Sequence, residues 1–98
     1  MKVIFEQSGG LAGLRQHLDI DTEELKSFDA VVLLMLIDEV DFFALPERII
    51  STRPQPDRFR YSITVSTNEG SHTVSVSEEA MPAGLEKLVR WLTERVGE

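Results

Sequence analysis

The stretch Ser8-Gly9-Gly10-Leu11-Ala12-Gly13-Leu14 lies between two short runs of β-type residues and decides how the first part of the chain folds. Lys2 to Gln7 precedes it, and Leu14 to Ile20 follows it. Two strands joined by so short a segment are typical of an antiparallel hairpin, and glycine supplies the positive φ angles that an irregular connection needs. The stretch is longer than a two-residue turn, so we expect the loop to project Leu11.

Leu11 has two interpretations. In the first, the stretch is a glycine-rich hairpin with a bulge, and the leucine side chain folds back onto the core. In the second, the leucine is an anchor that the loop offers to the pocket of a partner. Spacing and composition alone do not distinguish these interpretations.

The composition is typical of one soluble globular domain over residues 1–98. Hydrophobic residues make up 42% of the chain, charged residues make up 28%, and the net charge is −7. Because the chain has no run of Lys and Arg, we expect no nucleic-acid partner. It also has no cysteine, which excludes disulfides and thiolate chemistry.

The sequence contains no segment typical of membrane insertion or export. Its longest apolar run, Ala30 to Ile37, is too short to span a bilayer. The N-terminus lacks a charged stretch followed by an apolar region, as a signal peptide would have. We therefore expect no membrane partner and a cytoplasmic location.

Residues 28–40 are predicted to form a helix. The apolar run from Val31 to Ile37 would also suit a buried strand, but acidic residues lie on both sides of it and the segment is longer than a usual strand. Such a helix has no evident polar face, and one sheet covers only part of its circumference. Two alternatives remain open for the rest: burial beneath the C-terminal helix, or cover by a second copy or another partner.

The second half of the chain predicts another hairpin followed by another helix. Residues 58–65 and 71–76 alternate between apolar and polar side chains, and Asn68-Glu69-Gly70 supplies the turn between them. Pro82 suits a first helical turn, and apolar residues then recur at helical spacing up to Val96. The predicted fold is α+β with the order β-β-α-β-β-α, a four-stranded, mainly antiparallel sheet with two helices packed on one face.

The predicted order of elements brings three connections to one rim of the sheet. If the first helix runs towards the glycine-rich loop, the connection from Pro46 to Asp57 and the segment from Ser77 to Met81 lie beside that loop. The candidates for contacts on this rim are Arg53, Asp57, Glu78 and Glu79. The turn at residues 68–70 falls at the opposite end.

Few side chains in the sequence suggest catalysis. His17 and His72 are the only histidines and lie in predicted strands, and there is no H-E-x-x-H helix, nucleophile elbow, P-loop or dinucleotide fingerprint. The carboxylates lack the Asp/Asn-Gly spacing of metal-binding loops. We therefore predict a protein that is not an enzyme and has no catalytic residue, metal site or cofactor.

Five segments, taken in chain order, resemble the emfourin family. They are Ser8-Gly9-Gly10-Leu11-Ala12-Gly13, Phe42-Phe43-Ala44-Leu45-Pro46, Arg58-Phe59-Arg60-Tyr61-Ser62-Ile63-Thr64-Val65, Ser71-His72-Thr73-Val74, and Pro82 followed by Leu85, Leu88, Trp91 and Leu92. The resemblance extends over nearly the whole chain. Emfourins are small bacterial proteins regarded as inhibitors of protealysin and other thermolysin-like zinc metalloproteases.

The resemblance implies an inhibitor that places its glycine-rich loop in the cleft of a thermolysin-like metalloprotease. Such enzymes are expected to accept a bulky apolar residue just after the scissile bond, which Leu11 would supply, with Leu14 as the alternative anchor. The implied protease-binding residues are Ser8, Gly9, Gly10, Leu11, Ala12, Gly13 and Leu14. No residue is evidently placed to ligate the zinc of the enzyme, so we favour occlusion of the cleft over chelation.

Two other functions are compatible with the sequence. The chain could be a dimerising scaffold or a regulatory interaction subunit that uses the apolar face from Val31 to Ile37. It could also hold a small molecule between the sheet and the helices, which would require a sizeable apolar cavity.

Overall fold

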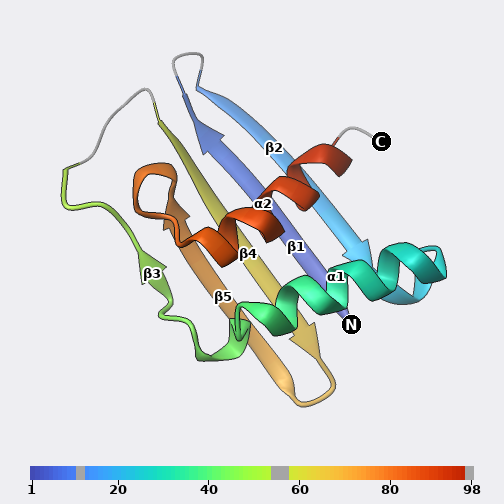
Figure 1. Cartoon of the computed structure of the whole chain (residues 1–98). Helices are drawn as coiled ribbons and strands as arrows, with labels where there is room; N and C mark the ends of the chain where they lie inside the picture. The colour runs from blue at the N-terminus through green and yellow to red at the C-terminus, as the bar shows by residue number, and fades with distance from the viewer. Residues whose placement is uncertain (11–12, 54–57, 97–98) are drawn as a thin grey trace.

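A computed structural model describes residues 1–10, 13–53 and 58–96. Within these residues, five strands form one sheet in the order β2-β1-β4-β5-β3, and two helices cover one of its faces (Figure 1). The strands are β1 (Lys2–Gly9), β2 (Leu14–Asp21), β3 (Arg48–Ile49), β4 (Phe59–Thr67) and β5 (Gly70–Ser77). The helices are α1 (Ser27–Glu39) and α2 (Ala83–Arg95), with short 3₁₀ turns η1 (Thr22–Glu24), η2 (Phe42–Ala44) and η3 (Glu78–Ala80).

The two hairpins and the α+β class are as predicted. β1 pairs antiparallel with both β2 and β4, and β4 pairs antiparallel with β5. Alternate residues of these strands face the helices and are buried there: Val3, Phe5, Ile20, Ile63, Val65, Val74 and Val76. The other face is polar, and on it Thr64 and Thr73 share a hydrogen bond of 2.8 Å between their hydroxyl oxygens. Because only one face is apolar, both helices lie on the same side of the sheet.

The sheet has a fifth strand, whereas the sequence analysis predicted four. β3 pairs in parallel with β5, with Ile49 opposite Val76, and the Ser75 amide donates to the Glu47 carbonyl over 2.8 Å. Two residues between Pro46 and a proline-rich stretch show no strand periodicity of their own. Their conformation depends on pairing with the edge of β5, and this tertiary contact is not visible in a local pattern.

α1 does not run towards the rim with the glycine-rich turn, and that expectation is wrong. The helix crosses the opposite end of the sheet (Figure 1) and is followed by η2, where the Leu45 carbonyl lies 2.8 Å from His72 Nε2 near the beginning of β5. β3 then carries the chain alongside β5, and the connection reaches the rim at Ser51, whose amide donates to Ser77 Oγ over 2.8 Å. A helix packs where apolar side chains need cover, and chain order does not fix that position.

The two helices lie antiparallel and differ in how much of their surface they bury. The Arg95 guanidinium near the end of α2 lies 2.9 Å from the Asp29 carboxylate near the start of α1, and Gly84 near the start of α2 lies beside Val40 after the end of α1. α2 buries Leu85, Leu88, Val89 and Leu92, whereas α1 buries Leu33 and Ile37.

Deep burial of α1 beneath α2, the first alternative from the sequence, is wrong, because Val31, Leu34 and Met35 of the apolar run are 53%, 46% and 55% exposed. Pro82 also departs slightly from the prediction, since it is the extended residue before the first turn of α2 (φ −64°, ψ 151°). Among the described residues, no helix has the length and apolar character that crossing a membrane requires.

Candidate functional site

The glycine-rich turn between β1 and β2 has a backbone that favours glycine. Gly9, Gly10 and Gly13 have φ angles of 98°, 77° and 62°, in the left-handed region that L side chains rarely adopt. The Gly13 amide donates to the Gly10 carbonyl over 3.2 Å and so closes the turn. These positions therefore set the path of the chain on both sides of Leu11 and Ala12.

The base of this turn is held against the start of β4. The Gly10 amide donates to the Arg58 carbonyl over 3.2 Å. A Cβ atom on Gly9 would lie 2.6 Å from that same carbonyl oxygen, and one on Gly10 would lie 2.8 Å from the Phe59 ring. The glycines thus allow a close approach to a third strand, in addition to supplying unusual φ angles.

A row of aromatic rings connects the turn with the core. The Phe59 ring, beneath Gly10, lies 6.3 Å from the Tyr61 ring between centroids. Tyr61 stacks in turn on Phe5 at 5.9 Å, and Phe5 is fully buried in the centre of the sheet. Phe59 and Tyr61 are half-buried, so this row of ring contacts joins the base of the turn to the buried core at Phe5.

A carboxylate from η3 completes the rim. Glu78 accepts a hydrogen bond of 3.1 Å from the Phe59 amide through Oε1, and its Oε2 lies 3.7 Å from Arg58 Nη1. Ser77, which is 2% exposed, ties residue 51 to the same corner through the hydrogen bond described above. One end of the sheet therefore brings together the glycine-rich turn, the start of β4, η3 and the end of the connection that follows β3.

The predicted site residues divide into three groups. Gly9, Gly10 and Glu78 are brought together through Arg58, and Ser8 lies beside them in β1, opposite Arg60 of β4. Arg53 and Glu79 are exposed; the Arg53 amide is bound by Ser51 Oγ at 3.1 Å. Leu11, Ala12 and Asp57 lie outside the described residues, and of Leu14 only the backbone, paired with Gly9, is described.

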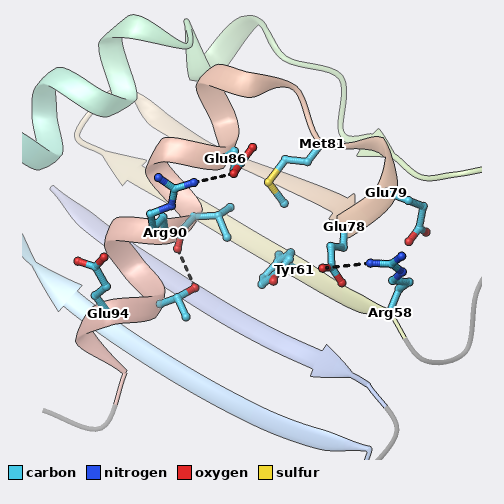
Figure 2. A pocket seen from close by; sticks show the side chains of 10 residues that line it. Arg58, Tyr61, Glu78, Glu79, Met81, Glu86, Arg90 and Glu94 are labelled. Atoms are coloured by element: carbon cyan, nitrogen blue, oxygen red, sulfur yellow. Dashed lines mark hydrogen bonds and ion pairs between the residues drawn. The ribbon is translucent and has the colours of Figure 1, made fainter.

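An open groove lies beside this rim, between the start of β4, η3 and α2 (Figure 2). Its volume is about 570 Å³. Tyr61, Met81 and Val89 supply the apolar lining, and the charged lining residues are Arg58, Glu78, Glu79, Glu86, Arg90 and Glu94. Figure 2 shows the Arg58–Glu78 pair on one side of Tyr61 and the Arg90–Glu86 pair, 2.7 Å apart, on the other. The lining carries more carboxylates than guanidinium groups.

Tyr61 is the group whose ionisation this groove alters. Burial raises the pKa of its hydroxyl above the usual 10.0, and the negative charge of Glu78 raises that pKa further. The hydroxyl therefore stays protonated at neutral pH and can donate a hydrogen bond. The arrangement suits a contact with polar or basic groups of a protein surface rather than proton transfer near neutral pH.

Sequence reasoning missed Arg58, Phe59 and Tyr61 as parts of this site. Periodicity gave the two hairpins separately, but the site depends on β1 lying next to β4, with Gly9 opposite Phe59. The sequence does show a strand beginning at Phe59 and two adjacent glycines at the end of the first strand. These features indicate a shared site only once β1 is known to pair with β4. Among the residues that the structure describes, no three or more His, Cys, Asp or Glu side chains form a group able to hold a metal ion.

Comparison with known proteins agrees with this architecture. The family model described as Emfourin matches residues 5–93, from the middle of β1 to the last turns of α2. The chain belongs to the emfourin family. The resemblance noted in the sequence is thereby confirmed.

A solved emfourin has the same fold. It is emfourin (M4in) from Serratia proteamaculans, described as an M4 family peptidase inhibitor, and the comparison gives a TM-score of 0.50 at 15% sequence identity. The match covers 99% of this chain and 90% of the Serratia chain. A sequence search of curated proteins finds no significant match. At this identity the structural likeness supports the shared emfourin fold, and the function is argued separately below.

Proposed function

We propose that this chain inhibits thermolysin-like zinc metalloproteases, the M4 family, by placing its glycine-rich turn in the active-site cleft. Membership of the emfourin family and the described role of the Serratia relative support the class of target. One observation carries the loop mechanism: the base of the turn is fixed to β4 by the Gly10–Arg58 hydrogen bond and by packing over Phe59. The base of the turn is thus held in place before the chain meets an enzyme.

Fixing the base of the turn favours tight binding of the loop. Binding an unstructured peptide costs the entropy of ordering it, and a pre-organised loop avoids most of that cost. Leu11 is the residue proposed to enter the enzyme pocket, with Leu14 as the alternative. The glycines before and after Leu11 leave the backbone slender enough for a narrow cleft. The chain blocks the cleft and does not coordinate the zinc ion of the enzyme.

The rim beside the turn is proposed to make the peripheral contacts. Arg53, Asp57, Glu78 and Glu79 are the candidates there, and the acidic groove next to Glu78 extends the same surface. Charges at the edge of an interface chiefly change the association rate and its dependence on salt. We therefore expect Glu79→Lys to change the association rate about tenfold or less, and to alter the dissociation rate little.

Titration of a thermolysin-like protease with the full chain tests the proposal. We expect stoichiometric loss of peptidase activity with the wild-type chain, and no effect on an unrelated zinc protease. Leu11→Asp is expected to weaken inhibition by a factor of about 100 or more, because a carboxylate replaces the apolar anchor of a buried contact. The far-ultraviolet circular dichroism of this variant should match that of the wild type.

Leu34→Asp is the matched control. It makes the same chemical change on α1, at the opposite end of the sheet, where Leu34 is 46% exposed. This variant should inhibit as the wild type does. Equal inhibition by Leu11→Asp and the wild type would overturn the loop mechanism, and no inhibition by the wild type would overturn the proposed function.

The predictions that the chain is not an enzyme and acts in the cytoplasm stay predictions. An inhibitor of this kind needs no catalytic residue of its own. The scaffold function considered from the sequence is favoured by one specific observation, the exposed apolar side of α1, which is developed next.

A further inference from the structure

α1 presents an apolar stripe to solvent on the side that faces away from the sheet. Phe28, Val31 and Met35 are 78%, 53% and 55% exposed, and they follow one another at the three- and four-residue spacing of a helix–helix seam. Leu34, at 46% exposed, lies along one side of the stripe. Leu33 and Ile37, on the opposite side of the helix, are buried against the sheet.

The stripe is large for a monomer. A fully covered aromatic side chain buries about 150–250 Å², so these four side chains together expose on the order of 400 Å². Two such stripes facing each other would remove about 800 Å² of apolar surface from water. With the flanking polar side chains the total approaches the roughly 1,200 Å² at the lower end of specific interfaces.

The charges at the two ends of α1 identify the occupant. Asp38 and Glu39 are exposed in the last turn, which contains no basic residue, so two carboxylates lie at the negative end of the helix dipole. Lys26 is exposed at the positive end, immediately before the first turn. Asp29 in the first turn of α1 is paired with Arg95 of α2 at 2.9 Å, and Glu23 and Glu24 belong to the separate turn η1, so Lys26 is the exposed charge next to the helix start.

An antiparallel copy of the same helix satisfies both ends at once. We propose that two copies of this chain dimerise through α1, related by a two-fold axis near Val31. In this arrangement Phe28 of each copy lies level with Met35 of the other, and Asp38 lies within about one residue of helix rise of the level of the other copy's Lys26. An interface of this kind is self-complementary, as two-fold symmetry requires.

The dimer does not depend on the inhibitor function. α1 crosses the end of the sheet opposite the glycine-rich turn (Figure 1), so pairing through its outer side leaves both turns accessible. Each dimer would then present two copies of the inhibitory surface.

The concentration dependence of the molecular mass tests the proposal. Sedimentation velocity of the full chain over a roughly hundredfold range of concentration should show a monomer–dimer equilibrium, because association follows mass action. Val31→Glu should leave the chain monomeric, and the far-ultraviolet circular dichroism should remain that of the wild type because residue 31 is exposed. A wild-type chain that stays monomeric over the whole range overturns the proposal.

Charge reversal tests the choice of partner. Lys26→Glu should weaken the dimer about tenfold, and adding Asp38→Lys should restore it. Lys87→Glu, the same change at an exposed position on α2, is the matched control and should leave the dimer unchanged. Equal weakening by the α1 and α2 variants would indicate a general effect of net charge and overturn the assigned arrangement.

Disulfide trapping tests the antiparallel direction, and the absence of native cysteine makes each introduced thiol unique. Val31→Cys lies near the two-fold axis and should cross-link readily under oxidation. Phe28→Cys chains should not cross-link to one another. In the antiparallel arrangement, residue 28 of one copy lies seven residues of helix rise, about 10 Å along the axis, from residue 28 of the other, which is beyond the reach of a disulfide. A mixture of Phe28→Cys and Met35→Cys chains should cross-link, and efficient Phe28→Cys homodimers would overturn the proposal.

Discussion

The two hairpins of this protein end in glycine-containing turns that the fold uses in different ways. The β4–β5 turn is closed by its own residues: the Thr67 hydroxyl donates to the Gly70 carbonyl and accepts from the Glu69 amide. A Cβ atom on Gly70 would meet nothing within 4 Å. The β1–β2 turn instead lies against the start of β4, so Gly9 and Gly10 serve a contact with a third strand. The β4–β5 turn only reverses the chain, whereas the base of the β1–β2 turn is also fixed against a third strand.

Gly9→Ala should show this difference most strongly. The new methyl group would sit 2.6 Å from a backbone carbonyl that cannot move without disturbing β4, and φ is 98°. We expect a loss of about 3 kcal/mol in the free energy of unfolding, measured by urea denaturation. Inhibition should weaken in parallel, since the base of the turn would be displaced. A loss below about 1 kcal/mol would show that the turn is not packed as described.

Gly10→Ala should cost less, about 2 kcal/mol, because its methyl group meets the edge of a side-chain ring, 2.8 Å away, instead of backbone. The ring belongs to Phe59, so Phe59→Leu should relieve part of the cost. A double-mutant cycle on unfolding free energies should therefore give a coupling of about 1 kcal/mol between the two positions. Strict additivity would contradict the proposed support of the turn.

Gly70→Ala is the matched substitution in the other turn and should cost about 1 kcal/mol, since only the positive φ of 144° opposes it. It should leave protease inhibition unchanged. An effect on inhibition as large as that of Gly9→Ala would remove the distinction between the two turns.

Glu78→Gln should have the smallest effect on stability, a few tenths of a kcal/mol, because its ion pair with Arg58 is partly exposed and the amide can still accept from the Phe59 N–H. Its clearer effect should be on Tyr61. Loss of the negative charge should lower the pKa of Tyr61, while burial still holds it above 10.0. Tyr61 is the one tyrosine of the chain, so ultraviolet absorbance reports its ionisation directly.

The sign of the pH dependence follows from this shift. The pKa of Tyr61 in the folded state lies above its value of 10.0 in the unfolded state, so its contribution to stability is fully present below pH 10.0. The contribution is lost as the pH rises through the pKa of the folded state. Tyr61→Phe should therefore lose less stability than the wild type between neutral and strongly alkaline pH, as measured by urea denaturation.

The sequence predicted the elements with a strong period of their own. The hairpin from Phe59 to Ser77 and the helix α2 were predicted because alternation and helical spacing each reflect one buried face. α1 was predicted as a helix from its length and its acidic flanks, although its apolar run is continuous. The emfourin resemblance was carried by short segments in a fixed order, and the family match confirms it.

What the sequence did not predict depends on contacts between distant segments. β3 exists because β5 offers an edge, and α1 crosses the far end of the sheet because apolar side chains there need cover. The rim around Gly10 needs the pairing of β1 with β4, so Arg58 and Phe59 were missed although the glycines were identified. Local patterns specify which residues are buried, and they leave open which elements become neighbours.

The unequal edges of the sheet have a consequence for the behaviour of this chain at high concentration. At one edge β3 covers two residues of β5, whereas at the other β2 runs for eight residues without a further strand in the part of the chain that the structure describes. Such an edge is a template for fibril growth, because its unpaired amides and carbonyls can accept another strand. On the polar face of β2, Arg15, His17 and Asp19 put charged or ionisable groups at every second position. A second β2 added in register would bring like groups together, so these side chains act as gatekeepers against amyloid-like stacking.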